Sequence, residues 1–394
     1  MFFPPVGGGA EVYLGRLIKA LGDNFDQYLW TTTPMDIVKA AGFGENCSIE
    51  SFGSSTTIDS TILPDWIEKK YKEIAQSVTS WAQKIQCDLL ILNTSFFYHA
   101  QFKSTIDSLK VAQPTGCIHH DIPSLPLSVL LDEYKKTENW EEALRIVTPQ
   151  LIEISKCEQK GMYPSTFSLG TDFTIYNSEW TRGFFDPKKE KQSIIFHPLI
   201  SRTHEHPKLG LKPVDFTIVN PLPTKGAVLF LALVLYHFRD QKFRILGGGY
   251  KSAMAKLEPF LCAENFGSNP RALPNNIEVL GHVQNMSEVY RNTKVLLQPS
   301  RLESYGMTSV EALFENCLVA TTDIPGINEG VGEGALQMPY HSTPQEWADS
   351  ISSALEHRDE WSEKISKRAD FIQNRKTEQI AGLEQFLESM VIKN

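Results

Sequence analysis

The chain has 394 residues, 41% of them hydrophobic and 22% charged, a composition typical of a globular protein with room for two domains of ordinary size. Its net charge of −9 is spread over both halves: residues 1–200 carry 18 basic and 24 acidic side chains, and residues 201–394 carry 20 and 23. Because binding a polyanion by counterion release needs a basic surface, this balance argues against nucleic acid as a partner.

The cysteines and the apolar segments indicate which cellular compartment to expect for this protein. Six cysteines are widely spaced and form no C-x-x-C pair, which favours free thiols in a reducing compartment over a zinc site. No basic segment followed by an apolar one opens the chain, so no signal peptide is expected, and the most apolar segment, residues 227–238, is too short to span a bilayer. We therefore expect a cytoplasmic protein without a transmembrane segment or a bound metal. Peripheral membrane contact is left open.

Buried strands alternate with amphipathic helices along the chain, the pattern of parallel α/β sheets. Strands are predicted in the first half over residues 87–93, 115–121, 173–178 and 193–198, and in the second half over residues 215–221, 242–248, 276–282, 294–300 and 317–323. Helices are predicted over residues 64–85, 227–238, 252–265 and 376–390. The polar segment 201–213 has neither the helical nor the strand periodicity of apolar residues. It predicts a linker between domains at 1–200 and 214–375.

Two patterns in the first domain point to ligands. Three consecutive glycines, Gly7 to Gly9, open the first predicted helix, where a backbone at positive φ lets a ligand approach main-chain N–H groups. A merely flexible turn would explain them as well. His119, His120 and Asp121 close a predicted strand, and ligands bind at the carboxyl ends of strands in open α/β sheets. We expect His119 to be structural.

The most informative stretch is residues 299–316, PSRLESYGMTSVEALFEN. The apolar run before it predicts a buried parallel strand, and a turn at Gly306 opens into a helix. Free backbone N–H groups and the helix dipole make such a turn an anion site. Glu303 and Glu311 flank the turn, and two acids would repel a bare phosphate. They suit a phosphate with hydroxylated rings on both sides, which is a nucleotide-sugar; two solvated surface acids are the alternative.

This E-x7-E spacing, with a glycine three residues after the first Glu, resembles the retaining GT-B glycosyltransferases of glycosyltransferase family 4. The resemblance implies two Rossmann-like domains facing each other across a cleft, and a C-terminal helix, within residues 376–394, that crosses back to the first domain. It implies that Glu303 lies by the donor sugar and that Glu311 binds the nucleotide ribose. The turn that holds the donor diphosphate then comprises Tyr305, Gly306, Met307 and Thr308.

The same resemblance assigns further residues to the donor. Lys225, at the start of the apolar helix, would neutralise the leaving diphosphate, and His120 would touch the donor sugar. The family commonly has an Arg five residues before this Lys, where this chain has Asn220. Arg301 is a candidate substitute, although an ordinary surface arginine explains it equally well. The other donor-binding positions lie in glycine turns and one loop: Gly8, Gly9, Gly248 and Val283.

We therefore expect a retaining hexosyltransferase that moves a sugar from a nucleoside-diphosphate-sugar to a hydroxyl acceptor, which is a glycan, a lipid-linked molecule, a peptide or a small molecule. No D-x-D lies near the turn of a sheet, so the leaving-group charge is expected to be met without a metal. The nucleotide-sugar is then a substrate, and no cofactor is expected.

Three alternatives are open to different degrees. A dinucleotide-dependent oxidoreductase is disfavoured, because no convincing ribose-binding acid follows a second strand. A catalytically inactive GT-B-like nucleotide-sugar-binding or scaffold protein is harder to dismiss, because Asn220 departs from the family pattern. An inverting transferase or a sugar-nucleotide epimerase of the same fold is separated from a retaining transferase by the anomeric configuration of the product.

Overall fold

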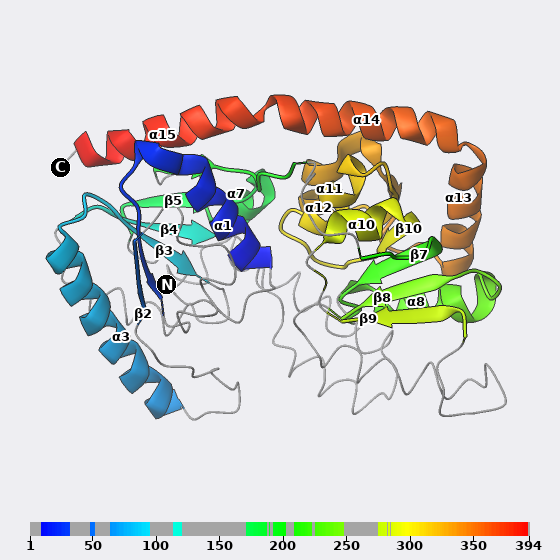
Figure 1. Ribbon diagram of the computed structural model, residues 1–394, viewed down its shortest axis with the longest axis horizontal. Helices are drawn as coiled ribbons and strands as arrows, with labels where there is room; N and C mark the ends of the chain where they lie inside the picture. Colours follow the sequence, from blue (N-terminus) through cyan, green and yellow to red (C-terminus); the bar gives the residue numbers. More distant parts are fainter. Residues whose placement is uncertain are drawn as a thin grey trace. The chain divides into compact units, whose positions relative to one another are not determined.

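The computed structural model divides the chain into two compact units (Figure 1). The described residues up to Leu199, together with those from Lys376 onward, form unit 1, and those from Ile200 to Arg375 form unit 2. The structure describes residues 9–31, 48–51, 64–94, 113–119, 171–186, 189, 192–201, 209–222, 225–247, 275–281, 283 and 285–392.

Unit 1 contains two parallel sheets, one with the order β3-β4-β5-β6 and a separate pair β1-β2. Its strands are β1 (Tyr28–Thr31), β2 (Ser48–Ser51), β3 (Leu90–Thr94), β4 (Thr115–His119), β5 (Phe173–Tyr176) and β6 (Ser193–Ile195). Its helices are α1 (Gly9–Leu21), η1 (Gly22–Asn24), α3 (Pro64–Ile85), α7 (Glu179–Phe185) and α15 (Lys376–Ile392). Ser178 caps α7 by accepting a hydrogen bond from the N–H of Thr181 at 3.0 Å.

The C-terminal helix α15 packs inside unit 1. Its Phe386 ring meets Phe173 of β5 edge-on, with 5.8 Å between ring centroids, and Leu383, Leu387 and Met390 are buried beside it. The predicted C-terminal helix that returns to the first domain is thus present.

Unit 2 is built on one six-stranded parallel sheet with the order β12-β11-β10-β7-β8-β9. Its strands are β7 (Val214–Val219), β8 (Phe243–Leu246), β9 (Ile277–Leu280), β10 (Thr293–Gln298), β11 (Leu318–Thr322) and β12 (Leu336–Met338). Its helices are α8 (Ala227–Ala232), the π-helical turn η4 (Leu233–His237), α10 (Met286–Arg291), α11 (Met307–Phe314), α12 (Pro325–Val331), η5 (Gly332–Gly334), α13 (Pro344–Glu356) and α14 (Arg358–Asn374).

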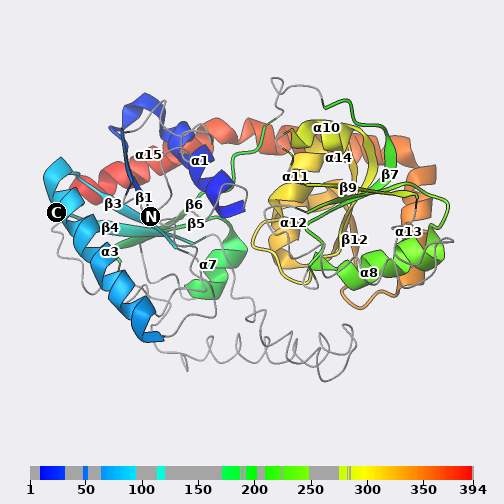
Figure 2. The same cartoon turned by 60° about the horizontal axis from the view of Figure 1, so that its bottom comes forward.

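Helices cover both faces of this sheet, as the near-continuous apolar runs of its strands require (Figure 2). One face buries alternate residues such as Phe216, Ile218 and Val295 against α8, η4 and α13. The other face buries Leu296 and Val319 against α11, α12 and α14. Strand order and layering are those of a doubly wound, Rossmann-like unit, and with the parallel sheet of unit 1 they confirm the predicted α/β class.

A carboxylate anchors the segment that enters the sheet of unit 2. Glu288 of α10 accepts hydrogen bonds from the backbone N–H groups of Leu209 (2.5 Å) and Leu211 (2.9 Å), within the predicted linker. These bonds favour the ionised carboxylate and lower the pKa of Glu288. The described end of the linker is therefore tied to unit 2.

The nine strands and the long helices predicted from the sequence are present wherever the structure describes them, and the helix predicted over 252–265 lies outside the described residues. Cys87, Cys117 and Cys317 are free thiols, as expected, and burial raises the pKa of Cys317 to about 12. Among the described helices, none combines the length and apolarity needed to cross a bilayer.

Candidate functional site

The centre of the site is an ion pair at the carboxyl edge of the unit 2 sheet. Lys225, between β7 and α8, donates from Nζ to Oε1 of Glu303, which follows β10. The same oxygen accepts hydrogen bonds from Gln298 Nε2 (2.9 Å) and Ser300 Oγ (3.0 Å). Within the described part of the chain, Oε2 of Glu303 accepts no hydrogen bond. The carboxylate is thus held by one oxygen and offers the other to a ligand.

Glycines allow the site segments to approach closely. Gly226 has φ = 84°, and a Cβ there would lie 2.3 Å from Cγ of Pro299, so only glycine lets the start of α8 reach the end of β10. A Cβ at Gly326 of α12 would lie 1.9 Å from the carbonyl oxygen of Glu303. The loop that carries Glu303 is therefore clamped against α12.

The turn after Glu303 presents unused backbone donors. Gly306 adopts the left-handed conformation (φ = 72°) and is the N-cap of α11. The N–H groups of Gly306, Met307 and Thr308 donate no hydrogen bond to the described part of the chain, as expected for the first turn of a helix. The hydroxyl of Ser309, in the same turn, is buried and has no partner there either. These donors and the helix dipole suit an anion.

The remaining residues of the motif differ in accessibility. Glu311, in the middle of α11, is half-buried, and its Oε2 accepts a hydrogen bond from the Tyr290 hydroxyl (3.3 Å). Tyr305 is buried in the core between α11, α12 and α14, and burial raises its pKa. Its side chain is thus part of the packing of unit 2. Val283 lies half-buried after β9.

Asn220 directly follows β7 and has a left-handed backbone (φ = 53°), a conformation that asparagine tolerates better than most residues. Its Oδ1 is buried and accepts no hydrogen bond from the described residues. A buried amide oxygen without a partner costs free energy, and a ligand or a water that donates to it would recover that cost.

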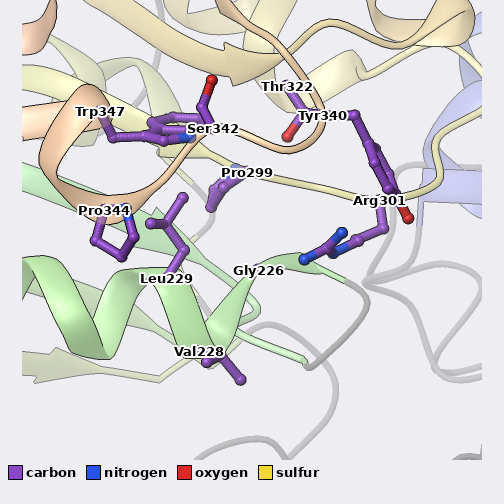
Figure 3. Close-up of a pocket in the computed structure, with 10 residues that line it drawn as sticks. All are labelled: Gly226, Val228, Leu229, Pro299, Arg301, Thr322, Tyr340, Ser342, Pro344 and Trp347. Atoms are coloured by element: carbon purple, nitrogen blue, oxygen red, sulfur yellow. The ribbon is translucent and has the colours of Figure 1, made fainter. Parts of the chain in front are cut away.

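Arg301 lies apart from the ion pair, in a small cavity at the carboxyl ends of β10, β11 and β12 (Figure 3). Its guanidinium stacks on the ring of Tyr340, with 4.6 Å from Cζ to the ring centroid. The cavity has a volume of about 50 Å³ and is also lined by Gly226, Leu229, Pro299, Thr322 and Trp347. No hydrogen bond or ion pair joins Arg301 to the described part of the chain.

Several predicted site residues cannot be compared with the structure. Gly8, His120 and Gly248 lie outside the described residues, as do Gly7 and Asp121, while Gly9 is the first residue of α1. His119 is buried at the end of β4 and stacks on Tyr176 with 5.6 Å between ring centroids, consistent with the structural role expected for it.

Sequence reasoning missed Gln298 and Ser300, which hold the carboxylate of Glu303. Both are polar residues at the end of an otherwise apolar strand, Gln298 5% and Ser300 0% exposed. Polar groups buried at the carboxyl end of a parallel strand are the signal that could have indicated them.

Comparison with known proteins finds a family model and solved structures that are similar to this chain. Residues 216–357 match the family model described as glycosyl transferases group 1. No curated protein sequence matches the chain. Among solved structures, it is similar to the HepE protein of Anabaena in complex with UDP-glucose, with 13% identity, 98% of each chain covered and a TM-score of 0.65.

Two further solved structures are similar over almost their whole length. Sucrose-phosphate synthase of Thermosynechococcus elongatus shares 14% identity, with 99% of this chain and 96% of that chain covered and a TM-score of 0.68. Trehalose-6-phosphate synthase OtsA shares 12% identity, with 100% and 98% covered and a TM-score of 0.65. At such identities the likeness shows the fold. This chain therefore has the GT-B fold, and its residues 216–357 are similar to the family described as glycosyl transferases group 1.

Proposed function

We propose that this protein transfers a hexose from a nucleoside-diphosphate-sugar to a hydroxyl acceptor, with retention at the anomeric carbon and without a metal. The observation that carries the proposal is the grouping of Lys225, Glu303 and the open N–H groups of α11 at one edge of the unit 2 sheet. A cation and backbone donors suit a diphosphate, and a carboxylate with one open oxygen suits a sugar hydroxyl. The HepE protein, whose solved structure is similar to this chain, was crystallised in complex with UDP-glucose.

In this reaction the bond from the anomeric carbon to the diphosphate oxygen breaks, and a bond to the acceptor oxygen forms on the same face. The acceptor proton passes to the departing diphosphate. Negative charge grows on the leaving group, so Lys225 and the N–H groups of residues 306–308 contribute most when they stabilise that charge. Glu303 orients the sugar and stabilises positive charge at the anomeric carbon. Glu311 binds the ribose, and His120 is proposed to contact the sugar.

Asn220 supports a second candidate, a GT-B-like protein that binds a nucleotide-sugar without turning it over. The family's usual Arg at this position would add a cation for the leaving group. One charge-assisted hydrogen bond is worth about 1.5–3 kcal/mol, or roughly one to two decades in rate. That loss slows a transferase without abolishing it, so we favour the enzyme. Slow hydrolysis of a nucleotide-sugar in the absence of acceptor distinguishes the two.

The proposal is tested by calorimetry with UDP-, GDP-, ADP- and dTDP-sugars, followed by kinetics on the best donor. We expect Glu311→Ala mainly to raise the donor KM, because it removes ribose binding in ground and transition states alike. We expect Lys225→Ala mainly to lower kcat. An α-linked product from an α-linked donor, seen by NMR, and activity in EDTA would support retention and metal independence. Equal and negligible effects of both substitutions would contradict the roles proposed for Lys225 and Glu311.

A further inference from the structure

We propose that the Arg301 cavity binds a small oxyanion, a carboxylate or a phosphate, carried by one of the two sugar substrates. This inference rests on the proposed transferase function and narrows its substrate class to acidic sugars. The observations that carry it are an arginine held in place without an anionic partner among the described residues, a cavity of limited volume, and the place of Arg301 in the loop that carries Glu303.

Arg301 is oriented before any ligand arrives. The Tyr340 ring supports one face of the guanidinium, and Figure 3 shows its terminal nitrogens directed into the space between Gly226 and Thr322. Because no carboxylate among the described residues pairs with it, its N–H donors are available to a ligand. A planar guanidinium in this situation prefers an oxyanion that it can bind through two parallel hydrogen bonds.

The volume of the cavity suits a small group. A single water needs roughly 10–15 Å³ of such space, so a volume of about 50 Å³ accepts a group of a few heavy atoms. That is the size of a carboxylate or a phosphate. The Thr322 hydroxyl points into the cavity and adds a donor, while Leu229, Pro299 and Trp347 keep the site apolar around the anion (Figure 3).

Residues of the cavity wall are sequence neighbours of the two residues in the ion pair. Gly226, in its wall, directly follows Lys225, and Arg301 precedes Glu303 by two residues. We place the oxyanion on a sugar because Glu303, which is proposed to face the sugar, lies two positions from Arg301 in the same loop. Two sources of the oxyanion share this chemistry: the carboxylate of a uronic-acid donor, and the phosphate of a phosphorylated sugar acceptor.

Calorimetry on the full chain separates these sources. The donor arm compares UDP-glucuronate with UDP-glucose, and the acceptor arm compares glucose 6-phosphate with glucose in the presence of UDP. The readout is the ratio of affinities for the acidic and the neutral sugar, because a general effect of a substitution on the nucleotide site cancels in it. We expect a ratio of about 10- to 100-fold in one arm, reduced to about onefold by Arg301→Met. Arg301→Lys, which keeps the charge but loses the paired hydrogen bonds, should be intermediate.

Lys364→Met is the matched control. Like Arg301, Lys364 is a cation that lies over an aromatic ring, that of Trp361, but it is an exposed residue of α14 outside the cavity. It should leave both ratios unchanged. Ratios near onefold in both arms, or ratios that survive Arg301→Met, would overturn the inference; if UDP still bound, the transferase proposal would stand. Absence of binding for every nucleotide and sugar would overturn both proposals.

Discussion

Glu303 and Lys225 neutralise each other in the structure, so a donor phosphate has to compete with a carboxylate for the same ammonium group. Both side chains are partly shielded from water, with 13% of Glu303 and 29% of Lys225 exposed. The hydrogen bonds from Gln298 and Ser300 keep the carboxylate in place when the lysine leaves it. In the proposed reaction, Glu303 would release the lysine to the phosphate and face the sugar.

This competition predicts opposite effects of Glu303→Gln on product binding and on catalysis. The substitution keeps the shape of the side chain but removes its charge, which frees Lys225 for phosphate. We expect UDP to bind several-fold more tightly and kcat to fall by about 100-fold or more, since charge stabilisation at the anomeric carbon is lost. Calorimetry with UDP and steady-state kinetics measure the two effects.

Glu315→Gln provides the control for that experiment. Glu315, at the C-terminal end of α11, is equally shielded, with a side chain 10% exposed, and pairs with Arg291 at 3.4 Å, outside the site. Its substitution should change neither UDP affinity nor kcat. Weaker UDP binding by Glu303→Gln would instead mean that the carboxylate positions Lys225 for phosphate, and the competition described above would be wrong.

The sequence indicated the ion pair only in part. Lys225 and Glu303 were both predicted at the donor, but their direct contact depends on Gly226 fitting against Pro299, a tertiary fit with no local signature. The support of Arg301 by Tyr340 joins residues far apart in the sequence. The left-handed backbone of Asn220 also could not be read from its neighbours, although asparagine is among the residues that tolerate it.

At the scale of elements, the short helix α12 determines where the Glu303 loop lies. Gly326 packs against the backbone of Glu303, and Gly330 packs against the carbonyl oxygen of Tyr305, 2.6 Å from where a Cβ would stand. Two glycines on one helix face thus form a flat surface on which the loop rests. The helix is itself buried on that side through Ile327 and Val331.

Gly326→Ala should therefore damage site and stability together. The added methyl group would meet backbone, which cannot move aside as a flexible side chain can, so α12 or the loop must shift. We expect a loss of about 1–3 kcal/mol in the free energy of unfolding, with a larger proportional loss of transfer activity. Gly382→Ala, in α15, is the matched control, because a methyl there meets nothing within 4 Å.

The control should raise stability by about 0.4–1 kcal/mol, since alanine restricts the unfolded chain more than glycine does. Denaturant unfolding and activity assays on both variants measure the difference. If Gly326→Ala were as harmless as Gly382→Ala, the loop would not rest on α12 in the way the backbone distances indicate.

Element prediction from the sequence succeeded for strands that are apolar runs of their own and missed β1, β2 and β12. β7, β10 and β11 are rich in apolar residues and covered on both faces, so their composition indicates strands. β1, β2 and β12 have only three or four residues and mix polar with apolar side chains, as in SIES and LQM. They are strands because a neighbouring strand pairs with them, and their own sequences have no alternating apolar pattern that would predict a strand.

At the scale of the whole molecule, the C-terminal end of the chain belongs to the N-terminal unit. α14 contributes Ile365, Ala369 and Ile372 to the core of unit 2, whereas α15, which begins two residues later, fills unit 1. Asn24 reinforces this docking by donating to Glu384 at 2.7 Å. Because each unit has its own core, a substitution that disrupts the packing of α15 should destabilise unit 1 and leave the stability of unit 2 unchanged.

Leu387→Ala tests this independence. Leu387 is 1% exposed, and truncating a buried leucine costs about 2–5 kcal/mol. We expect hydrogen exchange followed by mass spectrometry to show faster exchange in β4 and β5 of unit 1 and unchanged protection in β10 and β11 of unit 2. Ile392→Ala, at a side chain 83% exposed on the same helix, should change neither. Equal loss of protection in both units would mean that the chain unfolds as one cooperative body, with α15 stabilising unit 2 as strongly as unit 1.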